Sequence, residues 1–568
     1  MPNSPSVSQM VTADIVGQVI DEDGNPIHGA VVKTSTHTFI TDSDGVFQFI
    51  NIDCSKNKTV VEVNKPTFFK GFRTMYIIAN QDNYTVIRMI EKKNPSHFNA
   101  NSGGTIQVNG GGSISFSPHS IVNKSSGAPY TGNVTVYSTW IDPSSNQLGE
   151  LIPGALRGID ESEEEKLLES YGMVAAELFD DNNQALQIAQ GSTATITFPI
   201  TASLGVNAPN SIPLWYFDES SGMWKEQGSA QKQGNNYVGE VTHFSFWNCD
   251  VPSNFIHFEA TFKNPNGTPL ANVDVKITNT ANSTFGYART NSYGTVDGAI
   301  PKNANLILEA YSIICGATFH TQNLTTGTSD ITLNNIIINI PISYHVTLSG
   351  TILNCTNNIC KNGYVKCKIG NTIRFVRGSS NGNFYSSIVE CNTPVNAKLT
   401  AYDYTEGTYG LEATYVLNAG LNQLGNLSAC GNSYDQFVKW ENTINGVKTS
   451  HTITDIGGLF EGGIFFDFGV QENGIAAGDS LSIKAVSFSF DGAPSTSGNH
   501  YLVRYGDHLD SDLVIDTSYS YINTSIPVIL TKYEAIGGKI EGSFNGHIKG
   551  LNIPDRNVNC TFRVNRTN

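Results

Sequence analysis

The fold is decided by two neighbouring stretches, Ile15-Val-Gly-Gln-Val-Ile-Asp-Glu-Asp-Gly-Asn-Pro-Ile-His-Gly-Ala-Val-Val-Lys33 and Thr41-Asp-Ser-Asp-Gly-Val-Phe-Gln-Phe49. Apolar and polar residues alternate along both, which is the period of a half-buried β-strand. The turn at 23–26 joins the first two strands, and Asp44-Gly45 makes the next hairpin before Phe47 and Phe49 return to the core. The segment therefore predicts a small antiparallel β-sandwich.

This pattern occurs again further along the chain. A second copy runs Phe258-Glu-Ala-Thr-Phe-Lys-Asn-Pro-Asn-Gly-Thr-Pro-Leu-Ala-Asn-Val-Asp-Val-Lys-Ile277, with its second turn at 290–296. A looser third copy comprises 346–355, 362–367 and 380–385. Because other sequence separates the copies, the repetition predicts three related β-modules and not a tightly stacked solenoid.

Length and composition bound the function. The 568 residues predict about four or five domains, and the 54 glycines, 21 prolines and only 15% charged residues are typical of strands and turns. A formal charge of −16 has the wrong sign for a nucleic-acid-binding surface, so nucleic acid is excluded as a partner. The longest apolar stretch, 336–342, is interrupted by Asn339, and no transmembrane helix is expected.

The first two copies resemble the carboxypeptidase regulatory-like, transthyretin-like sandwich family. Residues 14–50 follow its G-x-V-x-D-x-x-G-x-P run and T-D-x-x-G-x-F turn, whereas 258–296 place Ala260 at the first glycine and lose the aspartate of the T-D pair. The third copy matches only in outline. The resemblance implies a non-catalytic sandwich, common on exported proteins, and brings no peptidase residues with it.

A larger β-unit over 104–250 separates the first two copies. It ends with Leu214-Trp-Tyr-Phe-Asp-Glu-Ser-Ser-Gly-Met-Trp224 and Val241-Thr-His-Phe-Ser-Phe-Trp-Asn-Cys-Asp250. These blocks, followed by a transthyretin-like module, resemble the extracellular domain of cartilage intermediate layer proteins. The resemblance implies an extracellular β-sandwich without a known catalytic role.

One short helix is predicted in this unit, because Ser162 and Glu165 have the spacing of a capping box. The acidic run 160–165 is interpreted as a solvated helix start, with a cation site as the alternative.

The last stretch, about 433–568, alternates as strands again. Its G-G-x-I-E-G-x-F-x-G run at 537–546 and final strand at 560–564 resemble the terminal domains of Gram-negative surface lipoproteins. Ile540, Gly542 and Phe544, with Phe562 and Val564, are expected to face inward. The resemblance implies a location on the surface of a Gram-negative cell, and it says little about activity.

The fold class is therefore all-β: serial antiparallel transthyretin- or immunoglobulin-like sandwiches, one larger sandwich and a C-terminal β domain. The predicted division is a tether over 1–13, sandwiches over 14–97, 103–251, 255–343 and 346–431, and a C-terminal domain over 436–568.

Nine cysteines are unevenly spaced, and five fall close together: Cys355, Cys360, Cys367, Cys391 and Cys430. The cluster has no C-x2-C pair and no histidine between its members, and both are typical of zinc sites. Disulfides in an oxidising compartment are therefore favoured over a zinc site. The connectivity stays open.

His243-Phe244-Ser245 is the sharpest catalytic candidate. In several β-sandwich families an H-F-S tripeptide cleaves itself, with serine as nucleophile and histidine as general base. The alternative interpretation, which we favour, is an ordinary aromatic strand in which His243 caps an edge.

Two binding sites are weighed in the same way. Asp507, Asp510 and Asp512 could supply three oxygens to calcium, the one cofactor considered, although a solvated loop is the favoured interpretation. Trp215, Tyr216 and Trp224 could stack on a sugar, but core packing is favoured.

No zinc-protease helix, P-loop, nucleophile elbow or dinucleotide motif is present, and no enzymatic activity is expected. The resemblances together imply an exported lipoprotein on a Gram-negative outer membrane, either periplasmic or external, with a binding or scaffolding role. Its expected partners are other outer-membrane proteins, for instance a large β-barrel. The alternative is a glycan-binding or adhesin surface lipoprotein with calcium-ordered loops.

Overall fold

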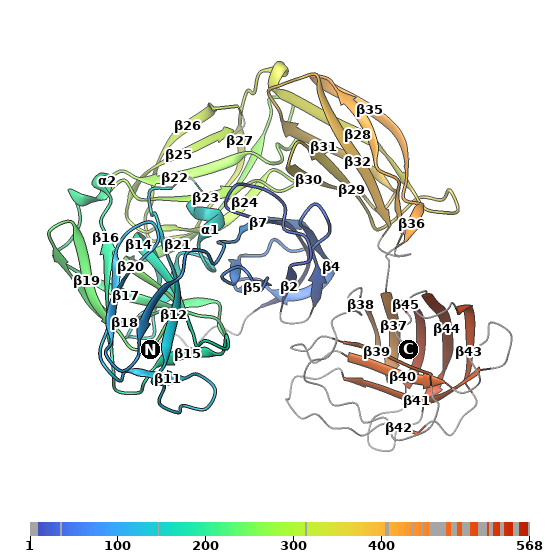
Figure 1. Cartoon of the computed structure of the whole chain (residues 1–568). Coiled ribbons are helices and arrows are strands. Elements are labelled where there is room, and N and C mark those ends of the chain that lie inside the picture. The colour runs from blue at the N-terminus through green and yellow to red at the C-terminus, as the bar shows by residue number, and fades with distance from the viewer. Residues whose placement is uncertain are drawn as a thin grey trace. The chain divides into compact units, whose positions relative to one another are not determined.

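A computed structural model describes the chain at residues 9–34, 37–145, 147–312, 315–403, 408–433, 437–444, 447–453, 473–478, 485–490, 500–508, 520–521, 526–533, 539–548 and 556–565. These residues are almost entirely β-structure, as predicted (Figure 1). No helix in the described ranges is long and apolar enough to cross a bilayer.

The first copy is built around its longest strand, β1 (Met10–Ile20). This strand pairs antiparallel with β4 (Val46–Ser55) and parallel with β7 (Asp82–Arg88), giving the sheet order β4-β1-β7. Ile15, Val16 and Val19 are fully buried, as the alternation predicts. Two further pairs complete the strands of this copy: β2 (Val31–Lys33) with β3 (Thr38–Ile40), and β5 (Thr59–Asn64) with β6 (Gly71–Met75).

The other two copies repeat this sheet. In the second copy β21 (Phe255–Lys263) lies between β24 (Thr295–Pro301) and β27 (Ile331–Ile337), and in the third β28 (His345–Leu353) lies between β31 (Asn383–Val389) and β35 (Gly420–Ser428). In each, the first strand pairs parallel with the last. The remaining elements are β22 (Asp274–Asn279), β23 (Phe285–Arg289), β25 (Asn305–Ser312), β26 (Ala317–Thr325), a 3-10 turn at Ile342–Tyr344, β29 (Gly363–Ile369), β30 (Thr372–Arg377), β32 (Val395–Asp403), β33 (Thr408–Gly410) and β34 (Ala413–Leu417).

One turn explains why the sequence repeat is visible. Gly45, Gly294 and Gly382 all have φ between 71° and 76°. Their carbonyls accept from the amides of Val19, Phe262 and Ile352 at 2.7, 2.8 and 2.8 Å. A Cβ on Gly45 or Gly294 would lie 2.3 Å from a backbone oxygen, so this turn requires glycine. The predicted threefold repetition is confirmed.

The large domain, β8 to β20, forms a network of thirteen strands whose main path is β11-β15-β14-β20-β17-β18-β19-β16-β10-β9. Its main core holds Trp247, Tyr171 and Tyr237 at 0–2% exposure. The elements are β8 (Ser96–Asn99), β9 (Gly104–Gln107), β10 (Ser113–Phe116), β11 (Ile121–Asn123), β12 (Asn133–Ile141), α1 (Leu148–Leu151), β13 (Arg157–Ile159), β14 (Glu165–Phe179), β15 (Ala185–Ile188), β16 (Ala194–Pro199), α2 (Ala202–Gly205), β17 (Ser211–Asp218), β18 (Met223–Gln233), β19 (Asn236–Val241) and β20 (Phe246–Ser253).

The helix predicted from Ser162 and Glu165 is wrong. Residues 160–164 form a turn closed by a hydrogen bond from the Glu164 amide to Asp160 Oδ1 at 2.8 Å, and Glu165 begins β14. Strand β14 pairs with β12 along one side and β20 along the other, and these ladders outweigh a local capping signal.

The first copy and the large domain share a hydrophobic core. Phe69 and Phe72 pack in one buried cluster with Trp215, Phe217 and Phe246. The Phe72 and Phe217 ring centroids are 4.9 Å apart. The two sandwiches are therefore joined by packing as well as by chain connection.

The C-terminal part is described only in its strands. Its nine-stranded sheet has the order β38-β37-β45-β44-β43-β41-β40-β39, with β42 paired to β41. Phe544 and Phe562 are buried, as predicted. The strands are β36 (Gly431–Ser433), β37 (Phe437–Ile444), β38 (Val447–Ile453), β39 (Asn473–Gly478), β40 (Ala485–Phe490), β41 (His500–His508), β42 (Ser520–Tyr521), β43 (Pro527–Tyr533), β44 (Lys539–Ile548) and β45 (Arg556–Asn565).

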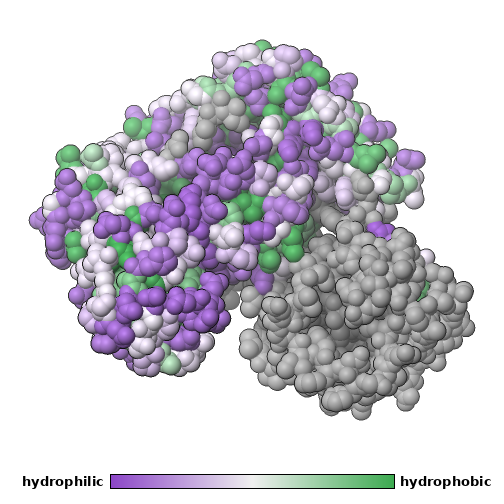
Figure 2. All heavy atoms as spheres, in the orientation of Figure 1, coloured by the Kyte–Doolittle hydropathy of each residue, from purple (hydrophilic) through white to green (hydrophobic). Residues whose placement is uncertain are grey.

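On the described face drawn in Figure 2, hydrophilic residues predominate and hydrophobic residues form separate small patches. Several exposed apolar side chains belong to the third copy and its borders, among them Ile342, Leu411, Val416 and Leu421.

Candidate functional site

A cavity of about 370 Å³ lies where the first copy, the large domain and the second copy meet. Its walls come from β6 and β7, from the segment 148–157 that contains α1, and from β22 to β24. Ligand sites of this size occur preferentially at such domain junctions. We refer to it as the junction cavity and take it as the candidate functional site.

Strand alternation places Arg73 at the junction cavity. Along β6, Phe72 and Thr74 are buried while Gly71, Arg73 and Met75 stay partly accessible. Arg73 donates from Nη1 to the carbonyl of Gly154 at 3.3 Å and from Nη2 to that of Val86 at 3.1 Å. Burial lowers the pKa of Arg73 to about 10, and Glu150 acts in the opposite direction.

The nearest carboxylates are already engaged. Glu150 accepts from Arg88, whose Nη2 lies 2.8 Å from Glu150 Oε2. Asp274 accepts from Arg289, with Nη2 and Oδ1 2.7 Å apart. Burial alone would disfavour the Arg289 cation, but Asp274, Tyr84 and Glu150 together raise its pKa. In the part of the chain that the structure describes, no carboxylate lies within 4.0 Å of Arg73.

Aromatic side chains form much of the remaining wall. Tyr76, Tyr84, Tyr287 and Tyr311 all line the junction cavity. Burial raises the pKa of Tyr76 to about 12, although the guanidinium of Arg157, 4.1 Å from the ring centroid, acts the other way. Burial also raises the pKa of Tyr84, Tyr287 and Tyr311, so these phenols are neutral donors at physiological pH. Three arginines lie beside the rings, and Arg157 and Arg289 are paired with Glu165 and Asp274, whereas Arg73 has no carboxylate within 4.0 Å among the described residues.

Ion pairs fasten the first copy to the third. Lys366 Nζ lies 2.7 Å from Asp44 Oδ2 and 3.3 Å from Asp42 Oδ2, and Lys368 also bonds to Asp44. Burial by itself raises the pKa of Asp44, but the bonds from Lys366 and Lys368 outweigh it and leave the pKa below 3.8. A second contact joins Arg377 to the buried Asp14 at 2.7 Å, and Tyr364 donates to the same carboxylate.

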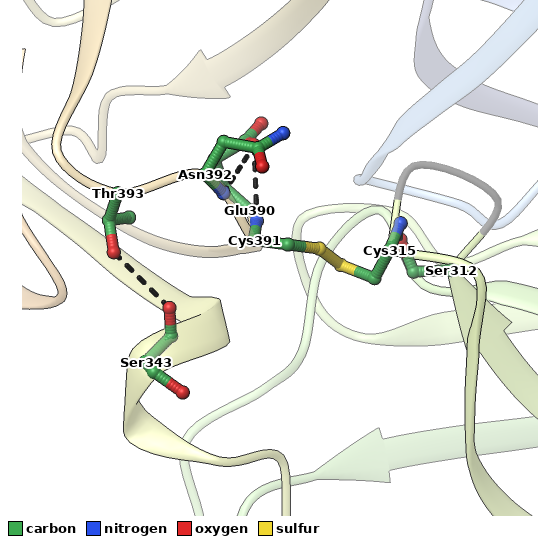
Figure 3. The surroundings of a disulfide bond; sticks show 7 residues. All are labelled: Ser312, Cys315, Ser343, Glu390, Cys391, Asn392 and Thr393. Carbon is green, nitrogen blue, oxygen red and sulfur yellow. Dashed lines mark hydrogen bonds between the residues drawn. A yellow bond between two sulfur atoms is a disulfide. The ribbon is translucent and has the colours of Figure 1, made fainter.

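Polar contacts and a disulfide hold the second copy. Asn291 Nδ2 donates to Gln81 Oε1 of the first copy at 2.8 Å. The Ala271 amide donates to the Ser387 carbonyl of the third copy at 3.1 Å. Cys391, four residues beyond Ser387, forms a disulfide with Cys315, and the Cα atoms are 5.5 Å apart (Figure 3). The bond therefore links the second copy to the third.

The cysteine prediction is confirmed in part. Cys391, Cys355 and Cys430 are disulfide-bonded, but Cys391 pairs with Cys315, which lies outside the predicted cluster. The other two, Cys360 and Cys367, keep their thiols in the core of the third copy, and five candidates cannot all pair with one another. Cys360 donates to the Tyr402 carbonyl at 3.9 Å, and burial raises the pKa of Cys367 to about 12. Both side chains face the core of the third copy, which explains why they are buried thiols and not members of disulfides.

The His243-Phe244-Ser245 tripeptide precedes β20. The Ser245 hydroxyl donates to the Phe246 carbonyl at 3.2 Å, and the His243 ring packs against Tyr216 and Trp247, with centroids 4.7 and 5.0 Å away. Gln187 bonds to both the amide and the carbonyl of Phe244, at 2.8 and 3.1 Å. Burial lowers the pKa of His243. These contacts do not test self-cleavage, which stays the disfavoured alternative, and a denaturing gel of the full chain would decide it.

The calcium prediction lies mostly outside the described residues, because Asp510 and Asp512 are not among them and only the backbone of Asp507, in β41, is described. Within the described ranges no group of three His, Cys, Asp or Glu side chains is placed to hold a metal. In the acidic run, Asp160 and Glu164 pair with Lys166 at 3.4 and 2.6 Å.

The aromatic hairpin is core, as favoured. Trp215 and Trp224 are both 0% exposed. Its indoles therefore offer no surface on which a sugar could stack.

Sequence reasoning missed the junction cavity. Arg73 is a charged residue inside an alternating strand. In a chain with so few charged residues, such a position could have indicated a binding site. Its neighbours Glu150 and Arg289, however, come from other modules, and one sequence does not show which modules meet.

The chain is similar to known proteins over part of its length. No family model matches the chain. Human cartilage intermediate layer protein 2 is 24% identical over 216 residues, which are 34% of this chain and 18% of that protein. The mouse protein is 31% identical over 116 residues, covering 19% and 9%. The predicted resemblance to these proteins is thus supported by sequence similarity, although the chain spans less than a fifth of their length.

The solved structures that match this chain include several pilins. The shaft pilin SpaA from Lactobacillus rhamnosus GG, as a double mutant, is 10% identical with a TM-score of 0.17, covering 32% of this chain and 98% of that one. The major pilin BcpA of Bacillus cereus is 10% identical with a TM-score of 0.13, covering 58% and 99%. A likeness at these scores says nothing about function.

Proposed function

We propose that this chain is an exported, non-enzymatic scaffold that binds other proteins on a Gram-negative outer membrane, to which a lipid near its N-terminus tethers it. The observation that carries the proposal is the fastening of the first copy to its three neighbours. A shared aromatic core, buried ion pairs and side-chain hydrogen bonds hold these modules in one arrangement. Rigid modules of this kind present edges and loops at fixed separations, which suits docking better than turnover.

Two further observations support the location and the role. Four cysteines are disulfide-bonded, which fits an oxidising compartment. At the end of the sheet order β31-β28-β35, strand β35 carries Leu421 at 56% exposure. Edge strands with exposed apolar residues are common sites of protein association.

The test is isolation of the native complex from detergent-solubilised outer membranes through a tag on the full chain. Recovery of defined outer-membrane proteins, weakened by Leu421→Lys and kept by Val206→Lys, would support the proposal. Val206 is 91% exposed in the large domain and serves as the matched control. Recovery of this chain alone would count against an accessory-subunit role.

A further inference from the structure

The junction cavity combines a cation that lacks a carboxylate partner with flat apolar walls. Arg73 uses two of its five N–H groups on the carbonyls of Gly154 and Val86. Both acceptors are neutral, so they do not compensate the charge. Because Arg73 is only partly accessible to water, an anion bound beside it would gain a charge-assisted contact that water supplies incompletely.

The two acids close to Arg73 define which anion fits. Glu150 is held by Arg88, and Asp274 by Arg289. Arg157, which also lines the cavity, is paired with Glu165, and Asp297 bonds to His257, so among the described residues Arg73 is the lining cation whose charge no ion pair balances. A singly charged anion balances that charge, whereas a phosphate dianion would leave an excess negative charge beside paired acids. A single carboxylate matches the planar fork of one guanidinium.

The rest of the lining defines the body of the ligand. Tyr76, Tyr84 and Tyr287 supply rings, while Ile152 and Phe258 supply apolar surface. Aromatic walls favour a flat ring by offset or edge-to-face contact. We infer that the junction cavity binds a small organic monocarboxylate with a flat apolar body, its carboxylate against the guanidinium of Arg73.

The cavity also provides a way to block the site without touching the charge. Gly298 of β24 lines it, and a Cβ built there meets no atom within 4 Å. A leucine at this position would therefore extend into the cavity space. Because the backbone of Gly298 is not in the left-handed region, the substitution carries no strain of its own.

The experiment uses the full chain with benzoate as probe, followed by calorimetry and by ligand-observed NMR. Benzoate should bind, and neutral benzamide of the same shape should bind at least about tenfold more weakly, since a charge-assisted contact is worth that much. Arg73→Met and Gly298→Leu should each weaken benzoate at least about tenfold. Lys93→Met removes an exposed cation of the first copy and should leave binding unchanged.

Several results would overturn the inference. Equal binding of benzamide, unchanged affinity in a folded Arg73→Met variant, or no benzoate binding at millimolar concentration would each do so. Tighter binding of inorganic phosphate than of benzoate would overturn the assignment to a monocarboxylate. If Arg73→Met does not fold, Gly298→Leu decides, because unchanged benzoate affinity there would place the probe elsewhere.

Discussion

The carboxyl group of Asp250 is completely buried in the large domain. It accepts a hydrogen bond from Asn248 Nδ2 at 2.5 Å, but its Oδ1 has no partner. Burial, reinforced by the charge of Glu169, raises the pKa of Asp250 well above 3.8. The folded state therefore binds this proton more tightly than the unfolded state, so the contribution to stability is full below about pH 3.8 and is lost as the pH rises.

Asp250→Asn should remove the part of the pH-dependent loss of stability that ionisation of Asp250 causes. The free energy of unfolding of the variant, minus that of the wild type, should increase from pH 4 toward pH 7, by about 1.4 kcal/mol for each unit by which the pKa is raised. Denaturant unfolding followed by tryptophan fluorescence reports chiefly on this domain, which contains four of the five tryptophans of the chain: Trp140, Trp215, Trp224 and Trp247. Other titrating groups are common to both proteins and cancel. A constant difference across this range would show that Asp250 is not held protonated.

A second residue-scale prediction concerns Lys366 and Asp44. Their side chains are 7% and 9% exposed. Removing only the lysine leaves a buried carboxylate with less compensation, so Lys366→Met should cost about 3 kcal/mol. Because the pKa of Asp44 is lowered, this stabilisation is present above pH 3.8 and is lost as the pH falls through the folded-state pKa.

A double-mutant cycle checks the pair. Lys366→Met with Asp44→Asn should be less destabilising than the sum of the single changes, by about 1 to 3 kcal/mol at pH 7. Lys398→Met is the matched control, since Lys398 lies on the same copy but its side chain is 53% exposed beside Glu412. Strict additivity would mean that the contact does not couple the two copies.

At the scale of elements, strand periodicity and turn chemistry predicted the three copies well, because both are local. The glycine turns at Gly45 and Gly294 could be located from sequence since no other residue fits them. The false helix at Ser162 arose because its capping signal is also local, whereas the β14 ladder that decides the outcome pairs residues far apart in sequence. The junction cavity and the pairing of Cys315 could not be predicted for the same reason.

Strand β45 carries the next prediction. It lies between β37 and β44 and buries Val558, Cys560 and Phe562 at 0–1% exposure. Deleting 558–568 removes most of an interior strand and leaves two unpaired edges, which promote association. The truncated chain should lose the thermal transition of its C-terminal sheet, which contains Trp440, and aggregate. The fluorescence transition of the large domain, which holds the other four tryptophans, should persist. Deletion of 566–568 alone is the control, and an unchanged profile after the longer deletion would contradict the prediction.

At the scale of the whole molecule, the copies and the large domain are joined more closely than a string of modules. Three predicted junctions, 97–103, 251–255 and 343–346, fall in or beside β8, the β20–β21 pair and β28. The amide of Ala100, for example, donates to the Gly132 carbonyl at 3.0 Å. Protease sites within such hydrogen-bonded backbone are cut only after local opening.

Limited proteolysis should therefore yield a persistent fragment that ends near residue 429, with 343–346 protected by the disulfide beside it. Cys315→Ser with Cys391→Ser releases a loop of 76 residues and should lower stability by about 2 to 4 kcal/mol. Loss of the disulfide should let the segment between the second and third copies open, so 343–346 becomes cleavable. The opening should stay local, because the hydrogen bond from the Ala271 amide to the Ser387 carbonyl remains. Mass spectrometry of the fragments identifies the sites, and Cys249→Ser, in a fully buried thiol outside any disulfide, controls for loss of a cysteine as such. Early cleavage of the oxidised wild type at 343–346 would show instead that the disulfide joins two modules that already move independently.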